Sequence, residues 1–134
     1  MFEIYSSTTV KPLPQKFELI GKRSFYIENN VEKSWTDAAA ACREFGGFLA
    51  AFQNQEELNT IQARLKYWWY WTGINDLKTK KFVSLASGKP SAIFQRHNFK
   101  TNHSKSCVVV DRQYMSEFDC NNKLYFICQL DEDT

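Results

Sequence analysis

The sequence predicts an α+β domain in which two helices flank small antiparallel sheets, and three features of its pattern indicate this class. Apolar residues recur at helical spacing only in the first half, over residues 34–65. Short runs of β-branched and aromatic residues lie on both sides of those helices. Residues 86–106 are rich in Ser, Gly, Asn, Lys and Pro, which predicts a long loop of the kind that usually carries function.

Two short strands and a helix are expected to begin the domain. Residues 17–20 and 24–27 are β-prone, and Gly21 favours a turn between them. Ser34 is suited to cap a helix, with Asp37 three positions later and a Gly-Gly pair to end it. Helical spacing predicts that this helix turns the following residues toward the core: Trp35, Ala38, Ala39, Cys42 and Phe45.

A second helix is expected after Asn54, which can cap it, with Glu57 three residues later. Its apolar face is predicted to consist of Leu58, Ile61 and Leu65. Further short strands are expected at residues 48–50, 69–74, 82–84, 107–110 and 124–128.

Three segments are expected along the 134 residues. Residues 1–15 contain Pro and small polar residues, which predicts an N-terminal tail or linker. These residues lack the apolar stretch of a signal peptide, and we expect any such signal to have been removed. The folded domain is predicted over residues 16–130, followed by a C-terminal tail at 131–134. No apolar run approaches the length of a membrane span.

The chain contains four widely spaced cysteines, Cys42, Cys107, Cys120 and Cys128. They form no C-x-x-C pair, and the two histidines lie together in the loop, so the spacing argues against a structural zinc site. An even number of separated cysteines favours two disulfides and an oxidising compartment, with four buried free thiols as the alternative. Four cysteines allow three pairings.

Taken in order, several motifs resemble the C-type lectin-like superfamily over residues 17–129. They are Gly-Gly-Phe-Leu-Ala after Cys42, Trp-Thr-Gly-Ile at 71–74, and the terminal Tyr-Phe-Ile-Cys-Gln at 125–129. Residues 74–77 and 83–89 resemble the insect, fly-type lectins. The resemblance implies a C-type lectin-like fold with a long loop region, and two disulfides, Cys42–Cys128 and Cys107–Cys120.

The resemblance also implies that the family's calcium-dependent sugar site is lost. In the family, oxygens come from a loop triplet, from a Glu before one cysteine, and from an Asn-Asp pair before the next. These positions fall on Lys100-Thr101-Asn102, on Lys105 and on Ser116-Glu117, while Arg96 replaces a Trp that usually precedes the triplet. Only Asn102 and Glu117 keep ligand chemistry, whereas calcium takes six to eight oxygens. We therefore expect no calcium and no other cofactor.

Between Leu77 and Val110 the chain has no Asp or Glu, but it has seven basic residues: Lys78, Lys80, Lys81, Lys89, Arg96, Lys100 and Lys105. They form either a solvated set of loop cations or a site for anionic ligands. The candidate ligand-binding residues are Arg96, Lys100, Asn102, Lys105 and Glu117.

The same loop contains Asn102-His103-Ser104, which is either an N-glycosylation acceptor at Asn102 or a chance triplet. The aromatic run at 67–71 is expected mainly to pack in the core, with Trp68 or Tyr70 as an alternative ligand contact.

These observations predict a secreted, extracellular carbohydrate-recognition module, glycosylated and calcium-independent, whose expected ligands include anionic glycans. The alternative is a protein–protein recognition module on the same scaffold. A net charge of +2 gives no argument for nucleic acid. An enzyme is not expected, because the sequence shows no Ser/His/Asp or Cys/His arrangement.

Overall fold

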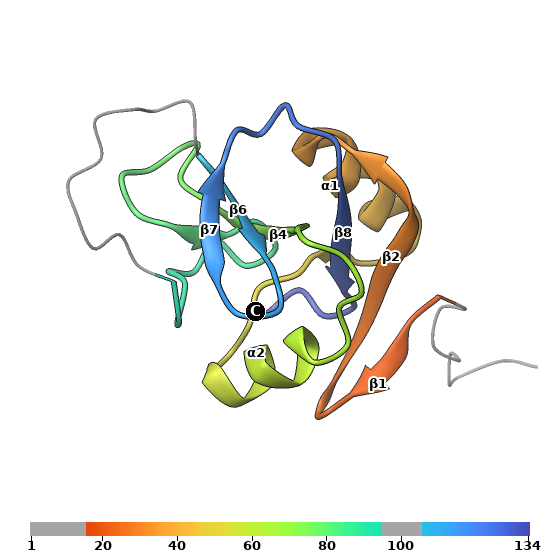
Figure 1. Cartoon of the computed structure of the whole chain (residues 1–134). Coiled ribbons are helices and arrows are strands. Elements are labelled where there is room, and N and C mark those ends of the chain that lie inside the picture. The colour runs from red at the N-terminus through yellow and green to blue at the C-terminus, as the bar shows by residue number, and fades with distance from the viewer. Residues whose placement is uncertain (1–15, 95–105) are drawn as a thin grey trace, which may run out of the picture.

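The computed structural model describes residues 16–94 and 106–134 (Figure 1). Its two helices are α1 (Trp35–Glu44) and α2 (Gln55–Gln62). Its strands are β1 (Glu18–Ile20), β2 (Arg23–Lys33), β3 (Phe48–Leu49), β4 (Tyr70–Asn75), β5 (Val83–Ser84), β6 (Cys107–Val110), β7 (Met115–Phe118) and β8 (Leu124–Gln129).

The strands of the described residues join edge to edge in the order β1-β2-β8-β4-β6-β7, with β3 paired to β8 and β5 paired to β4. The pairings are antiparallel except for β4 and β8, which run parallel. Helix α1 packs against β2 and β8, and α2 lies near the end of the sheet where β1 turns into β2 (Figure 1).

Both helices begin at the predicted capping residues. The Ser34 hydroxyl accepts a hydrogen bond from the Asp37 N–H at 3.3 Å, and the Asn54 side chain accepts one from the Glu57 N–H at 2.8 Å. Each cap satisfies a backbone donor that the first helical turn leaves unpaired. The predicted face of α2 is confirmed, since Leu58, Ile61 and Leu65 are buried.

The core-facing stripe of α1 differs in one residue from the prediction. Trp35, Ala38 and Cys42 are buried as expected, but Ala41 is buried more deeply than Ala39. Trp35 also makes a polar contact in the core, because its indole Nε1–H donates to the Thr72 carbonyl oxygen at 2.9 Å. This bond ties α1 to the central strand β4.

Both disulfides implied by the family resemblance are present, Cys42–Cys128 and Cys107–Cys120. The first joins α1 to β8. The second joins the start of β6 to the segment after β7, at the edge of residues 95–105. The alternative of four free thiols is therefore wrong.

Two strands differ from the prediction. Strand β2 extends to Lys33, beyond the predicted end at residue 27, and β7 was not predicted. Strand β4 begins at Tyr70, between β8 and β6, so Tyr70 and Trp71 are both fully buried although their side chains alternate. The hypothesis that Tyr70 contacts a ligand is wrong for this reason.

Residues 131–134, predicted as a tail, contact the body of the domain. Asp131 Oδ1 accepts a hydrogen bond from Arg23 at 2.6 Å, and the carbonyl oxygen of Thr134 accepts one from the Ser87 hydroxyl at 2.9 Å.

Candidate functional site

Four of the five candidate ligand-binding residues, Arg96, Lys100, Asn102 and Lys105, lie outside the described residues. The glycosylation candidate Asn102 lies there as well, so these assignments stay predictions. The fifth, Glu117, is a half-buried residue of β7 that stands opposite Val108 of β6.

The C-terminal end of the long loop is tied to the end of β4 by a backbone hydrogen bond. The Asp76 N–H donates to the Ser106 carbonyl oxygen at 3.0 Å, which joins the end of β4 to the start of β6. The side-chain amide of Asn75 is buried, and both its oxygen and its nitrogen are hydrogen-bonded. The oxygen accepts from the Leu77 N–H and the nitrogen donates to the Gly73 carbonyl oxygen, each at 3.1 Å. With the Cys107–Cys120 disulfide, these bonds make a rigid base for the loop.

Four of the seven predicted loop cations lie in the described residues, around the short strand β5. They are all exposed: Lys78, Lys80, Lys81 and Lys89. The loops that carry them are held by hydrogen bonds, such as that from the Thr79 hydroxyl to the Lys81 carbonyl oxygen at 2.6 Å and that from the Ser84 N–H to the Lys89 carbonyl oxygen at 2.9 Å. The described part of the scaffold thus presents positive charge on the loops before and after β5.

Across residues 16–94 and 106–134, no three His, Cys, Asp or Glu side chains are grouped in a way that would hold a metal ion. The positions where the family's calcium ligands would fall are mostly in residues 95–105, so the loss of the calcium site stays a prediction.

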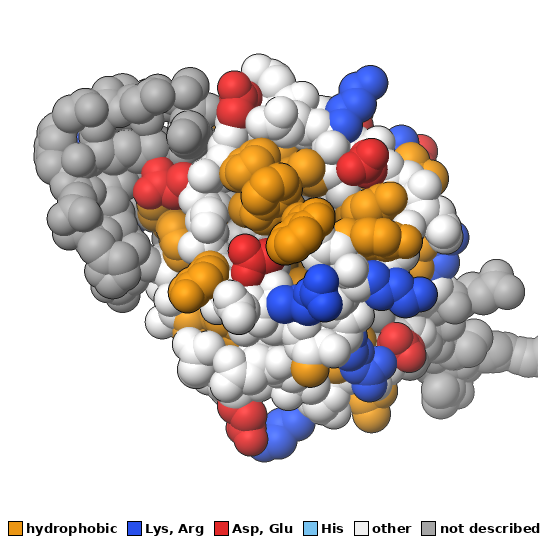
Figure 2. All heavy atoms as spheres, viewed as in Figure 1, with side chains coloured by type: hydrophobic (Ala, Val, Ile, Leu, Met, Phe, Trp, Pro, Cys, Tyr) orange, Lys and Arg blue, Asp and Glu red, His pale blue; other side chains and the backbone are white. Residues whose placement is uncertain are grey.

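A second feature of the surface is a group of exposed aromatic side chains between α2 and β4. The exposed fractions are 43% for Tyr67, 72% for Trp68 and 42% for Trp69. Tyr67 stacks on Tyr125 of β8 with ring centroids 4.8 Å apart, and Trp69 packs on Phe118 of β7 at 5.3 Å. Figure 2 shows hydrophobic side chains gathered on this face. Packing therefore accounts for one side of Tyr67 and of Trp69, while Trp68 is mostly open to solvent.

A hollow of about 320 Å³, which no pattern in the sequence indicated, adjoins these aromatic residues. Its lining comes from the segment before β4 and from the turn between β6 and β7: Tyr67, Trp68, Asp111, Arg112 and Gln113. The two segments are more than 40 residues apart in the sequence and meet only because β4 and β6 are paired.

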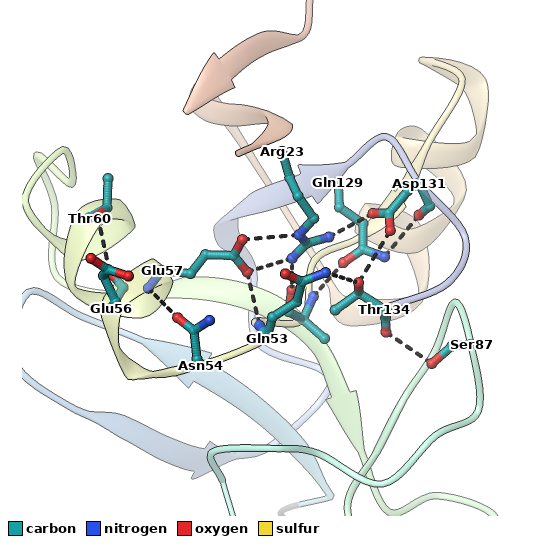
Figure 3. A network of polar contacts seen from close by, with 11 residues as sticks. Arg23, Gln53, Asn54, Glu56, Glu57, Thr60, Ser87, Gln129, Asp131 and Thr134 are labelled. Carbon is teal, nitrogen blue, oxygen red and sulfur yellow. Dashed lines mark hydrogen bonds and ion pairs between the residues drawn. The ribbon is translucent and has the colours of Figure 1, made fainter. Parts of the chain in front are cut away.

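A network of charged and polar side chains holds the first turn of α2 against β2 and the residues after β8 (Figure 3). Arg23 of β2 contacts Glu57 at 2.7 Å and Asp131 at 2.6 Å, and donates to the Ala51 carbonyl oxygen at 2.6 Å. Burial acts to lower the pKa of Arg23, but the hydrogen bonds and negative charges of Glu57 and Asp131 outweigh it and raise that pKa. Because every donor group of the guanidinium faces the protein, this network is structural.

The fold, the two disulfides and the long loop together define a C-type lectin. Residues 31–130 match the family model of the lectin C-type domain, and the chain belongs to this family.

Among its relatives are two fly proteins of Drosophila melanogaster. Accessory gland protein Acp29AB is 34% identical over 121 residues, which is 88% of this chain and 52% of the relative. C-type lectin 37Db is 30% identical over 129 residues, which is 89% of this chain and 85% of the relative. The chain thus spans about half the length of Acp29AB.

Solved structures confirm the fold. The C-type lectin domain of murine dendritic cell inhibitory receptor 2, in complex with N-glycan, superposes with a TM-score of 0.73 at 18% identity, covering 87% of this chain and 96% of that one. A calcium-independent type II antifreeze protein gives a TM-score of 0.72 at 24% identity, covering 87% and 92%. Within the part of the chain that the structure describes, neither helix has the length and apolar character needed to cross a bilayer.

Proposed function

We propose that this domain is an extracellular recognition module that binds glycans without calcium, and that anionic glycans are its main ligand class. The observation that carries the proposal is the charge of the long loop region, where seven basic residues occur without a single Asp or Glu. Two of them, Lys100 and Lys105, fall on positions where the family has oxygen ligands for calcium.

The electrostatics of such a replacement oppose metal binding. An ammonium group within about 4 Å of a calcium ion raises its energy by roughly 4 kcal/mol per unit of metal charge at an effective dielectric near 20. The same group attracts sulfate or carboxylate, and clustered cations raise the local concentration of an anionic ligand. The loss of calcium and the preference for an anion therefore have one physical cause.

Two further observations support the proposal. The described cations Lys78, Lys80, Lys81 and Lys89 are exposed on loops that hydrogen bonds hold in place. A protein of the same fold is described as calcium-independent. Secretion is part of the proposal, because two disulfides require an oxidising compartment to form and persist. Family members are generally binding modules, and we expect no catalytic activity.

The test is a glycan array run once in millimolar calcium and once in chelator, together with retention on a heparin column. We expect the array signal to be the same in both buffers and the heparin retention to fall with rising salt. The double variant Lys100→Glu/Lys105→Glu should lose retention, whereas the matched variant Lys22→Glu/Lys123→Glu, with the same change of net charge at two exposed lysines outside the loop region, should keep most of it.

Retention that is unchanged by the loop variant would contradict the anionic site. An array without signal in either buffer, together with capture of an extracellular protein that persists after deglycosylation, would replace glycan binding with protein recognition. Glycosylation of Asn102 is checked by mass spectrometry of protein expressed in insect cells, where the intact mass and the glycopeptide report its occupancy.

A further inference from the structure

We infer that the hollow between the segment before β4 and the β6–β7 turn is a second carbohydrate subsite, which binds one neutral sugar ring against Trp68. This inference rests on the proposed function, glycan recognition, but it concerns a different surface. The hollow lies beyond the end of β6 at Val110, whereas the long loop joins β6 at its other end, Cys107.

The aromatic wall of the hollow is held in position before any ligand arrives. Tyr70 is fully buried, and its hydroxyl oxygen accepts hydrogen bonds from the backbone N–H groups of Lys66 and Tyr67, at 3.2 and 3.3 Å. The same hydroxyl donates to the Asn29 side chain. Tyr67 is also fixed by its stacking on Tyr125. The backbone leading into Trp68 is thus anchored, which lowers the entropy lost when a ligand binds there.

Trp68 itself is free to receive a ligand, because 72% of its surface is exposed. The face of an indole ring is electron-rich, and it attracts the weakly positive C–H groups that cover one face of a pyranose ring. A sugar stacked in this way replaces water on the indole and keeps its hydroxyl groups at the rim.

The opposite wall supplies hydrogen-bonding groups for those hydroxyls. Asp111 Oδ1 accepts from the backbone N–H groups of Gln113 and Tyr114, both at 2.7 Å, which fixes the carboxylate. Gln62 of α2 donates to the Asp111 carbonyl oxygen at 3.0 Å and so ties the turn to the helix. Arg112 and Gln113 are exposed and add donors, so the wall offers both acceptors and donors, as neighbouring sugar hydroxyls require.

This combination favours a neutral sugar over other ligands of similar size. A purely apolar group would remove the charged side chains of Asp111 and Arg112 from water without adding a hydrogen bond to either, which costs free energy. A strongly anionic group would face the Asp111 carboxylate. The volume of about 320 Å³ lies at the lower end of the range for small-molecule sites, as expected for a single ring.

The test uses the four tryptophan indole N–H signals of the ¹⁵N-labelled chain, titrated in chelator with the methyl glycosides of mannose, galactose and N-acetylglucosamine. We expect at least one glycoside to shift the Trp68 signal saturably. The signals of Trp35 and Trp71 serve as internal controls, because their N–H groups donate to the carbonyl oxygens of Thr72 and Lys33 inside the fold.

Two exposed substitutions test the site directly. Trp68→Ala should abolish glycoside binding, and Gln113→Ala should weaken it about tenfold, while Leu19→Ala, at an exposed apolar residue on β1, should leave it unchanged. Unmoved Trp35 and Trp71 signals show that each variant is folded.

A Trp68 signal that no glycoside shifts would overturn the subsite. In that case the proposed function would still stand without the subsite if the glycan array showed binding that persists in chelator and is lost in the variant Lys100→Glu/Lys105→Glu. Glycoside binding that Trp68→Ala leaves intact would also overturn the subsite.

Discussion

Gly73 shows at the scale of one residue how closely the backbone segments of this fold approach each other. A Cβ atom placed on Gly73 would lie 2.5 Å from the Leu49 carbonyl oxygen, and one on Gly47 would lie 2.2 Å from that of Gln129. Both neighbours are backbone atoms, which cannot rotate away as a side chain can. Glycine is therefore required at Gly73 by the contact of β4 with β3, and at Gly47 by the contact of the segment before β3 with β8.

We predict that Gly73→Ala lowers the free energy of unfolding by about 2–3 kcal/mol, since overpacking of a core usually costs this much. Gly88→Ala is the control: Gly88 has a φ of 74° but no atom within 4 Å of an added Cβ, so only backbone strain of about 1 kcal/mol is expected. Urea denaturation measures both, and equal losses would show that the close approach is unimportant.

Tyr26 gives a prediction for alkaline pH. Burial, and then the hydrogen bond to Glu28 at 3.0 Å and its negative charge, raise the pKa of Tyr26 to about 12. A raised pKa means that the folded state holds this proton more tightly than the unfolded state, whose tyrosine has a pKa of about 10. The stabilisation is therefore complete below about pH 10 and is lost as the pH rises toward about 12.

The measurement is the difference in unfolding free energy between the unaltered chain and Tyr26→Phe at pH 8, 9 and 11.5. The difference should be constant between the first two values to within error and smaller at the third. A difference that is independent of pH across this range would contradict the assignment.

At the scale of the elements, the Arg23 network fastens α2 and the end of β8 to β2. The Arg23 and Glu57 side chains are only 9% and 10% exposed, so solvent screens their attraction weakly. Glu57 Oε1 also accepts a hydrogen bond from the Gln53 N–H at 2.9 Å, just before the helix. One carboxylate thus serves both the ion pair and the start of α2.

We predict that Glu57→Gln lowers the free energy of unfolding by about 1.5–3 kcal/mol, the range for hydrogen bonds to charged groups. Glu56→Gln is a matched control, because Glu56 lies in the same helical turn but is exposed, so the helix dipole effect is the same and the loss should be under about 0.5 kcal/mol. Similar losses for the two variants in chemical denaturation would show that the network adds nothing to stability.

Element β7 shows where the sequence did not predict the structure. Residues 115–118 are of mixed polarity and all are half-buried, so neither alternation nor an apolar run marks them as a strand. They are extended because β6 offers them its free edge and because Asp111 closes the turn between the two strands. Both causes lie outside the segment itself.

At the scale of the whole molecule, a disulfide and a backbone hydrogen bond hold the base of the long loop where it joins β6. The Cys107–Cys120 disulfide and the Asp76 to Ser106 hydrogen bond both act where the long loop joins β6. A ligand that binds only the native state raises the stability of the protein, and the increase grows with the ratio of the free ligand concentration to the dissociation constant. Thermal stability therefore reports directly on calcium binding.

We predict that millimolar calcium leaves the Tm of this domain unchanged, because cations occupy positions that the family fills with oxygen ligands. Differential scanning calorimetry with calcium, with magnesium as the ionic-strength control, and with chelator measures this. A rise of several degrees in calcium alone, reversed by chelator, would show that the metal site is intact.

The sequence by itself determined the family, both helix caps and most of the apolar faces that the helices bury. Capping residues and helical periodicity act within one short segment, and the order of the motifs and cysteines can be read along the chain. Within the aromatic run at 67–71, the tertiary structure alone decided which residues are buried. Tyr70 and Trp71 are covered because β4 lies between β8 and β6, while Trp68, two residues earlier, lies before the strand and stays exposed. The hollow beside Trp68 likewise arises only when strand pairing brings residues 67–68 next to 111–113, and no pattern within either segment encodes that contact.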